Sequence, residues 1–196
     1  MIIIGLTGPS GSGKTSVYGI AKSLGFKVVN CDALARKAVE PGSNGLADIV
    51  SAFGEGVLNS DGSLNRKALA SVAFSSDEKI LRLNHTLFPH IKSLVMSEIG
   101  EENILLDAPT LFESGLDKIC THTVAVLADE SIRRERIISR DGLSKEHADL
   151  RLHACKPDHF FIEKANYIVY NNKDIESFKT EINAIFKTII GGIKNV

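Results

Sequence analysis

Five short segments of the chain are apolar along most of their length, and this pattern predicts five buried β-strands. Strands of this kind are typical of a parallel sheet whose two faces are both covered by helices. After the first segment, apolar residues recur at helical spacing over residues 14–25, which end on a glycine. We therefore predict an α/β fold with a five-stranded parallel sheet flanked by helices. The predicted strand segments are residues 1–7, 26–32, 103–109, 122–129 and 165–172.

Two long helical segments interrupt the alternation of strands and helices. Residues 32–100 carry several helical patterns and no strand pattern, and they separate the second strand from the third. Because an ordinary connection in an α/β unit has about 2–6 residues, this segment predicts a helical lobe with a task of its own. We interpret it as the lobe that binds an acceptor substrate. The second helical segment, residues 131–164, links the last two strands and predicts a lid.

The length of the chain, 196 residues, allows one core with small appended lobes, and we expect a single domain. The predicted core comprises about residues 1–31, 101–130 and 165–196, the acceptor lobe about 32–100 and the lid about 131–164.

The composition favours a small-molecule ligand. With 23 Lys and Arg against 24 Asp and Glu, the net charge of −1 provides no basic field that would attract nucleic acid. No apolar run approaches the roughly 20 residues needed to span a bilayer, so we expect a cytoplasmic protein without a membrane partner. The three cysteines lack metal-ligand spacing, and we expect reduced thiols. We expect a monomer or a weak homo-oligomer.

Residues 8–15, GPSGSGKT, follow the first strand and carry the full G-x-x-x-x-G-K-[ST] signature of a phosphate-binding loop. Its glycines permit backbone angles that turn successive N–H groups around one anion. Lys14 is expected to reach the outer phosphates of ATP, and the Thr15 hydroxyl to ligate Mg²⁺. The alternative is a flexible turn with an exposed lysine, which the strand before and the helix after the loop disfavour. The residues that we expect to contact the nucleotide here are Gly8, Gly11, Ser12, Gly13, Lys14, Thr15 and Ser16.

Three further polar groups follow predicted strands. Ligands of open parallel sheets bind beyond the carboxyl ends of the strands, so Asp32, Asp107 and Asn171 are directed to the same crevice as the phosphate loop. Asp107 either holds Mg²⁺ through a water molecule or caps the following turn. Asn171 and its neighbours either contact the adenine or form only a turn before the last helix.

A phosphate loop alone does not distinguish a kinase from a GTP-driven switch. Guanine-specific switches usually carry N-K-x-D and D-x-x-G. The nearest match, NNKD at residues 171–174, places its aspartate one residue too early, and no aspartate is followed three residues later by glycine. The sequence therefore favours a kinase.

A kinase needs a base beside the acceptor hydroxyl and cations over the transferred phosphate. Asp32 is the best candidate for the base, and it could also serve as the N-cap of the following helix. Arg133, Arg136 and Arg140 recur at steps of three and four residues, so they line one side of a helix. They either pair with phosphate oxygens when a lid closes or form an ordinary solvated basic face.

Seven stretches follow one another along the chain: GLTGPSGSGKTSV, NCDALARKAVEPG, GLADIVSAFG, DGSLNRKALASVAF, LDAPTLFESGL, RRERIISRDGLSKEHADLRL and ANYIVYNN. Taken in this order, they resemble the dephospho-coenzyme A kinase family, which phosphorylates the ribose 3′-hydroxyl of dephospho-CoA with ATP. The resemblance implies a three-layer P-loop NTPase fold like that of nucleoside monophosphate kinases, with a helical CoA lobe and a lid. The alternative is another small-molecule kinase, which would phosphorylate a nucleoside monophosphate or a sugar.

The resemblance also implies roles for particular residues. It makes Asp32 the catalytic base, with Lys14 and Thr15 acting on the ATP phosphates and Mg²⁺. Arg136 and Arg140 match the lid arginines of the family, whereas Arg133 stands where other members commonly have a different polar residue. The segments that face the acceptor contain Arg36, Pro41 and Gly42.

Three positions depart from the family pattern. Phe88 occupies the position of a histidine, which leaves His85 or His90 as a substitute. Thr110 replaces an apolar residue, and Cys155 stands where glutamine is common. None of the three lies in the phosphate loop or at Asp32.

Overall fold

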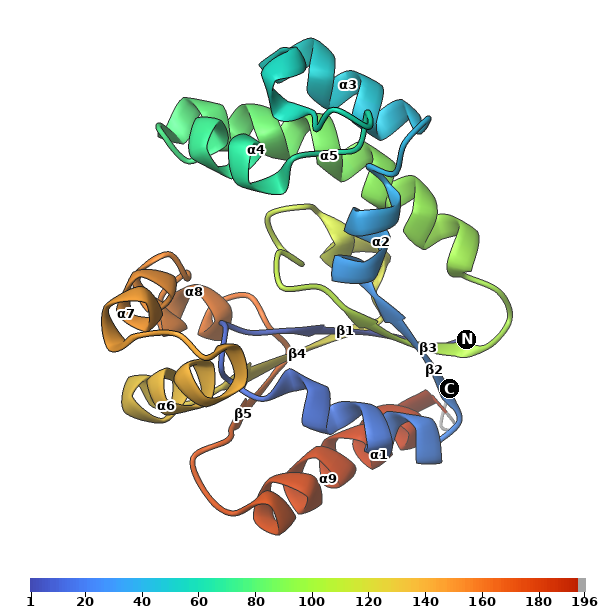
Figure 1. Ribbon diagram of the computed structural model, residues 1–196. Helices are drawn as coiled ribbons and strands as arrows, with labels where there is room; N and C mark the ends of the chain where they lie inside the picture. The colour runs from blue at the N-terminus through green and yellow to red at the C-terminus, as the bar shows by residue number, and fades with distance from the viewer. Residues whose placement is uncertain (194–196) are drawn as a thin grey trace. The chain divides into compact units, whose positions relative to one another are not determined.

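A computed structural model describes residues 1–193 and contains the predicted five-stranded parallel sheet (Figure 1). The strand order is β2-β3-β1-β4-β5, and β1 pairs in parallel with both β3 and β4. All five predicted strands are confirmed, which confirms the α/β fold class. The strands are β1 (Ile3–Thr7), β2 (Phe26–Asn30), β3 (Asn103–Asp107), β4 (His122–Leu127) and β5 (Tyr167–Tyr170).

The central and edge strands differ in burial. Every residue of β1 is buried, and so is all but the first residue of β3 and β4. In contrast, β2 and β5 are only partly buried, and Tyr170 at the end of β5 is exposed. An edge strand has a neighbouring strand on one side only, so its apolar sequence did not lead to complete burial.

The chain separates into two compact units. Among the described residues, the first contains 1–29 and 101–193, and the second contains Asn30–Gly100. The first unit includes the sheet and the segment between β4 and β5, and the second consists of the predicted acceptor lobe. The sequence division into core, lobe and lid stays a prediction.

In the first unit, α1 (Val17–Ser23) and α9 (Ile175–Ile193) cover one face of the sheet (Figure 1). Their apolar side chains, including Ile20, Phe178 and Phe186, form one buried cluster with β1 and β4 residues. On another part of the sheet, Phe161 of α8 (Asp158–Ile162) packs against Ala125 and Leu127 of β4. Burial of these faces is the main stabilising contribution to the sheet unit.

The predicted lid segment forms α6 (Glu130–Asp141), α7 (Lys145–His153) and α8. Gly142 adopts a left-handed conformation with φ of 63° and ends α6, so that α7 can fold back against it. Ile137 of α6 packs with Ala148 and Leu152 of α7.

The second unit is helical, as predicted. Four side chains, Asn30, Ser43, Asn65 and Ser76, accept hydrogen bonds from the first turns of the four helices, so each helix has an N-cap. A separate core contains Ile49 of α3. The helices are α2 (Cys31–Lys37), α3 (Asn44–Phe53), α4 (Arg66–Ala73) and α5 (Asp77–Glu98).

Three short 3₁₀ turns complete the described elements: η1 (Lys14–Ser16), η2 (Glu55–Val57) and η3 (Leu116–Ile119). Within residues 1–193, no helix combines the length and the apolar character required to cross a bilayer.

Candidate active site

The phosphate loop, residues 8–15, has the backbone conformation that its glycines predict. Gly8, Gly11 and Gly13 all have positive φ angles, of 136°, 81° and 93°. A side chain at any of the three would also collide with the protein. A Cβ atom at Gly8 would lie 2.1 Å from the Val126 carbonyl oxygen, and one at Gly13 would lie 2.2 Å from Nδ2 of the Asn171 side chain. The loop therefore requires glycine for conformation and for close packing.

Two side chains donate hydrogen bonds to carbonyl groups of this loop. Arg136 donates from Nη1 to the carbonyl oxygens of Gly11 and Ser12, at 3.4 and 3.3 Å. Asn171 donates from Nδ2 to the Ser12 carbonyl at 2.8 Å. These bonds fix the orientation of the two peptide groups that contain the Gly11 and Ser12 carbonyls.

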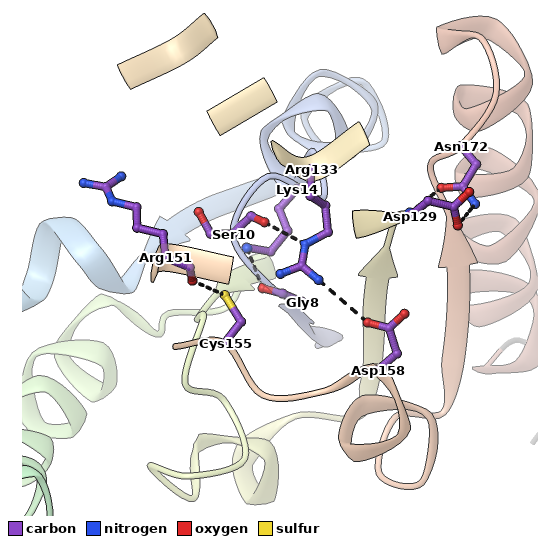
Figure 2. Close-up of polar contacts among 9 residues, drawn as sticks. All are labelled: Gly8, Ser10, Lys14, Asp129, Arg133, Arg151, Cys155, Asp158 and Asn172. Atoms are coloured by element: carbon purple, nitrogen blue, oxygen red, sulfur yellow. Dashed lines mark hydrogen bonds and ion pairs between the residues drawn. The ribbon is translucent and has the colours of Figure 1, made fainter. Parts of the chain in front are cut away.

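Lys14 lies across the loop and donates from Nζ to the Gly8 carbonyl oxygen at 2.7 Å (Figure 2). It begins the 3₁₀ turn η1, and the α-helix starts only at Val17. The expectation that the loop leads directly into an α-helix was therefore wrong by one turn. The N–H of Ser16 is bonded to the Gly13 carbonyl, which produces the tighter turn.

A cavity of about 450 Å³ lies beside the phosphate loop. It joins loop residues to one side of α6, so the structure brings Thr15 together with Arg136 and Arg140. The sequence interpretation missed Glu135 and Ser139, although their positions beside Arg136 and Arg140 on one helix could have indicated them. The lining residues are Gly11, Gly13, Thr15, Glu135, Arg136, Ser139 and Arg140.

The three arginines of α6 have different surroundings. Arg133 is 7% exposed and donates to the Ser10 carbonyl, so a solvated basic face is the wrong interpretation for it and for Arg136. Arg140 is exposed and donates from Nε and Nη2 to the two carboxylate oxygens of Asp141, both at 2.8 Å. This bidentate bond, together with the charges of Arg140 and Arg151, lowers the pKa of Asp141.

Asp107 is 4% exposed at the end of β3 and accepts a hydrogen bond from the Tyr18 hydroxyl of α1. The side chain therefore links the strand to the helix that follows the phosphate loop. Its carboxylate and the hydroxyl of Thr15, an exposed residue, are hard oxygen donors of the kind that Mg²⁺ prefers, so the chemistry of these donors suits a magnesium ion. The role of Asp107 at the metal stays a prediction.

Asn171 is also 4% exposed, and its contacts support the loop. Beyond the bond to Ser12, its N–H donates to the Leu127 carbonyl and its own carbonyl accepts from Arg136, at 2.8 and 3.0 Å. The sequence interpretation missed this supporting role, and the predicted adenine contact stays a prediction. The next residue, Asn172, exchanges two hydrogen bonds with Asp129 and so ties the end of β5 to the start of α6 (Figure 2).

Asp32 lies in the first turn of α2, and its side chain is exposed. It is not the N-cap: the Asn30 side chain accepts the hydrogen bond from the Ala33 N–H at 2.8 Å. The capping alternative for Asp32 is therefore wrong, because β2 ends two residues earlier and Asn30 takes that position. The role of Asp32 as the base stays a prediction.

The helical unit has a cavity of its own, of about 430 Å³. It contains the predicted acceptor residues Pro41 and Gly42, but Arg36 does not line it. His90 lines it and pairs with Asp48, with 2.7 Å between Nε2 and Oδ2. The lining residues are Lys37, Ala38, Glu40, Pro41, Gly42, Ser43, Asn44, Gly45, His90, Ser93 and Leu94.

Residues 2–177 match the sequence family described as dephospho-CoA kinase. This chain belongs to the dephospho-CoA kinase family. A Corynebacterium efficiens dephospho-CoA kinase is 34% identical over 200 residues, which cover 99% of this chain and 100% of the relative. A Pseudoalteromonas translucida dephospho-CoA kinase is 36% identical over 188 residues, with 94% and 90% covered.

Solved structures agree with this membership. A Campylobacter jejuni dephospho-CoA kinase superposes with a TM-score of 0.68 at 25% identity, over 97% of this chain and 98% of that one. A Thermus thermophilus protein superposes with a TM-score of 0.79 at 32% identity, over 95% and 97%. An Acinetobacter baumannii shikimate kinase reaches 0.60 at 16% identity over 98% and 94%, which indicates a shared fold only.

Phe88 occupies the position at which the dephospho-CoA kinase family usually has a histidine, and the structure shows where the nearby histidines lie. Phe88 is partly buried and His85 is exposed, whereas His90 faces the cavity of the helical unit. Of the two substitutes considered from the sequence, only His90 lines this cavity, and acceptor binding there stays a prediction.

Proposed function

We propose that this chain transfers the γ-phosphoryl group of ATP to the ribose 3′-hydroxyl of dephospho-CoA, giving coenzyme A and ADP. The observation that carries the proposal is the family match over residues 2–177, which includes the intact phosphate loop. The conformation of that loop, with three positive-φ glycines, supports triphosphate binding on the donor side.

On the donor side, the loop N–H groups and Lys14 are proposed to bind the β- and γ-phosphates. Lys14 would exchange the Gly8 carbonyl for phosphate oxygens, which provide a stronger, charge-assisted bond. Arg136 and Arg140 line the cavity beside the loop and are proposed to stabilise the negative charge on the transferred group. The segment around Asn171, residues 170–172, is proposed to contact the adenine.

We propose that Thr15 and Asp107 hold Mg²⁺, Thr15 directly and Asp107 through water. When bound, the ion supplies positive charge that neutralises the phosphate oxygens. In this chain the hydroxyl of Tyr18 keeps one Asp107 oxygen oriented by donating a hydrogen bond to it.

On the acceptor side, Asp32 is proposed to orient the ribose 3′-hydroxyl and to accept its proton. The hydroxyl oxygen forms a bond to the γ-phosphorus while the bond to the β,γ-bridging oxygen breaks, and ADP leaves. Since phosphoryl transfer passes through a loose transition state, the proton moves late. Arg36, Pro41 and Gly42 are proposed to contact dephospho-CoA.

Three free cysteines among the described residues are consistent with action in a reducing compartment. We propose that the enzyme works in the cytoplasm as a monomer or a weak homo-oligomer. Size-exclusion chromatography with light scattering measures the oligomeric state directly. A mass near 21.2 kDa supports the monomer, and a stable larger assembly contradicts the proposal.

An ATP-consumption assay with alternative acceptors tests the reaction. Purified protein with MgATP receives dephospho-CoA, a nucleoside monophosphate, shikimate or gluconate in separate reactions. We expect rapid ADP release with dephospho-CoA only. A preference for any other acceptor would establish the alternative, another small-molecule kinase on the same fold.

A further inference from the structure

One arginine of α6, Arg133, contacts the phosphate loop but does not line the cavity beside it. Arg133 is 7% exposed, and its Nε donates to the Ser10 carbonyl oxygen at 3.0 Å (Figure 2). It does not line the cavity that contains Arg136 and Arg140. Its role therefore differs from the phosphate contacts proposed for those two residues.

The loop and α6 are in close contact at this point. A Cβ atom at Gly11 would lie 2.7 Å from the Arg133 carbonyl oxygen and 3.0 Å from its Cα. The backbone of α6 therefore packs directly against the loop, and a small movement of either would change the Arg133–Ser10 hydrogen bond.

The guanidinium of Arg133 has few other partners. Nη1 lies 4.0 Å from Oδ1 of Asp158, the first residue of α8, and Nη2 is buried without a hydrogen-bond partner among the described residues. Burying an arginine is costly unless its charge and donors are satisfied. The single short hydrogen bond of this side chain goes to the phosphate loop, so a role limited to filling space does not account for the residue.

The geometry of one peptide shows what that hydrogen bond does. The Ser10 carbonyl and the Gly11 N–H belong to the same planar peptide and point in opposite directions. When Arg133 holds the Ser10 carbonyl, the Gly11 N–H is fixed in the opposite direction, away from the Arg133 guanidinium. Arg136 and Asn171 act on the next carbonyls, those of Gly11 and Ser12, so Arg133 alone controls the Ser10–Gly11 peptide among the contacts seen.

We propose that Arg133 is a positioning residue that fixes the Ser10–Gly11 peptide and presents the Gly11 N–H to the nucleotide phosphates. The inference rests on the proposed function only in requiring that the loop bind ATP. Asp158 balances the charge of Arg133, and the two side chains together connect α8 to Ser10 of the phosphate loop.

Arg133→Met tests the proposal, because methionine retains an unbranched chain but cannot donate. Arg134→Met is the matched control, since Arg134 is adjacent on α6 and bonds to Asp149 and Glu130 instead of the loop. Isothermal titration gives the Kd for MgATP, and hydrogen exchange measured by NMR gives the protection of the Gly11 amide in the ligand-free protein.

We expect Arg133→Met to raise the Kd and KM for ATP roughly tenfold or more, as expected for losing a charge-assisted hydrogen bond that orders a phosphate contact. The KM for dephospho-CoA should not change, and the Gly11 amide should exchange faster. Arg133→Lys should restore part of the ATP affinity. Arg134→Met should leave the ATP affinity and the Gly11 exchange unchanged.

Unchanged ATP affinity in a folded Arg133→Met protein would overturn the proposal, and so would an equal change in Arg134→Met. If Arg133→Met does not fold, Arg133→Gln replaces it: a smaller increase in Kd with faster Gly11 exchange supports the proposal, and wild-type values for both contradict it. The proposed function is tested separately from the role of Arg133. A wild-type protein that binds ATP but leaves dephospho-CoA unmodified refutes the proposed function, while the Arg133 comparison remains decisive for ATP binding.

Discussion

The sheet unit and the helical unit each contain a cavity of similar volume, about 450 and 430 Å³, but the two are built differently. The first is lined by the glycine loop, whose backbone is held in place by Arg136 and Asn171, and by side chains of α6. The second is lined by the connection between α2 and α3 and by residues of the helices around it, including His90, which pairs with Asp48. We expect a fixed backbone to suit phosphate binding, which every ATP-dependent kinase needs, and a lining of varied loop and helix residues to suit recognition of one acceptor.

The largest effect is expected at the donor side, from Lys14→Ala. Removal of the ammonium group should reduce kcat/KM by about 10³-fold or more, because a cation on the transferred phosphate stabilises the transition state directly. Lys22→Ala, an exposed lysine of α1, is the control and should retain wild-type kinetics. Steady-state kinetics of both proteins measure the difference, and a nearly normal Lys14→Ala enzyme would contradict the donor assignment.

Asp32→Asn tests the acceptor side of the same comparison. Loss of a general base should lower kcat by about 10²–10⁴-fold without unfolding the helical unit. Asp77→Asn is closely matched, since Asp77 is also an exposed acid in the first turn of a capped helix, α5. If Asp32 only stabilised the first turn of α2, both variants would have the same small effect on stability and neither would change kcat.

Arg140→Ala should have a smaller effect on the donor side, about 10²–10³-fold in kcat, as for the loss of one group that stabilises transition-state charge. Arg151→Ala is the control because Arg151 bonds to the same carboxylate, that of Asp141. Equal kinetics for the two variants would show that Arg140 serves only the surface ion pair.

Gly11→Ala and Gly25→Ala separate close packing from backbone strain. Both glycines have a φ of 81°, but a Cβ atom meets the Arg133 carbonyl only at Gly11 and has open space at Gly25. Each variant should lose about 1–2 kcal/mol from the unfavourable conformation. Only Gly11→Ala should also raise the KM for ATP, by roughly tenfold, because the loop must move. An unchanged KM in Gly11→Ala would show that the loop position is not critical.

The smallest effects concern two exposed carboxylates, one in each unit. The hydrogen bond from Arg140 lowers the pKa of Asp141, and hydrogen bonds from the Ser63 hydroxyl and N–H lower the pKa of Asp61. A lowered folded-state pKa contributes stability above the unfolded value near 3.8, and this contribution is lost as the pH falls through the lower folded value.

Melting temperatures of Asp141→Asn and Asp61→Asn should therefore lie slightly below wild type at pH 6 and converge with it below pH 3.8. High salt should reduce the Asp141 difference more than the Asp61 difference, because only Asp141 is paired with charged groups. A difference that grows as the pH falls would contradict the direction of both pKa shifts.

Local patterns explain how much could be predicted from the sequence. The phosphate loop, the five strands and the four helices of the second unit each depend on residues that are close in the chain. The first helical turn after the loop and the cap of α2 were predicted less well. Asn30 and Asp32 are both good caps, and the choice between them depends on where β2 ends.

Contacts between distant residues could not be predicted in this way. The Arg133–Ser10 hydrogen bond joins positions 123 residues apart, and the His90–Asp48 pair joins positions 42 apart. Arginine spacing on α6 indicated a shared face, but the depth at which each side chain lies depends on tertiary packing. That packing makes Arg133 a support for the loop and leaves Arg140 at the cavity.

The position of the new phosphate on the product tests the central claim, transfer from ATP to a ribose alcohol, most directly. The purified enzyme is incubated with MgATP and dephospho-CoA, and ³¹P NMR with mass spectrometry of the product locates the added group. We expect one new phosphomonoester on the ribose 3′-oxygen and one ADP for each product molecule. A group added to an existing phosphate, or ATP consumption without a phosphorylated ribose, would contradict the account.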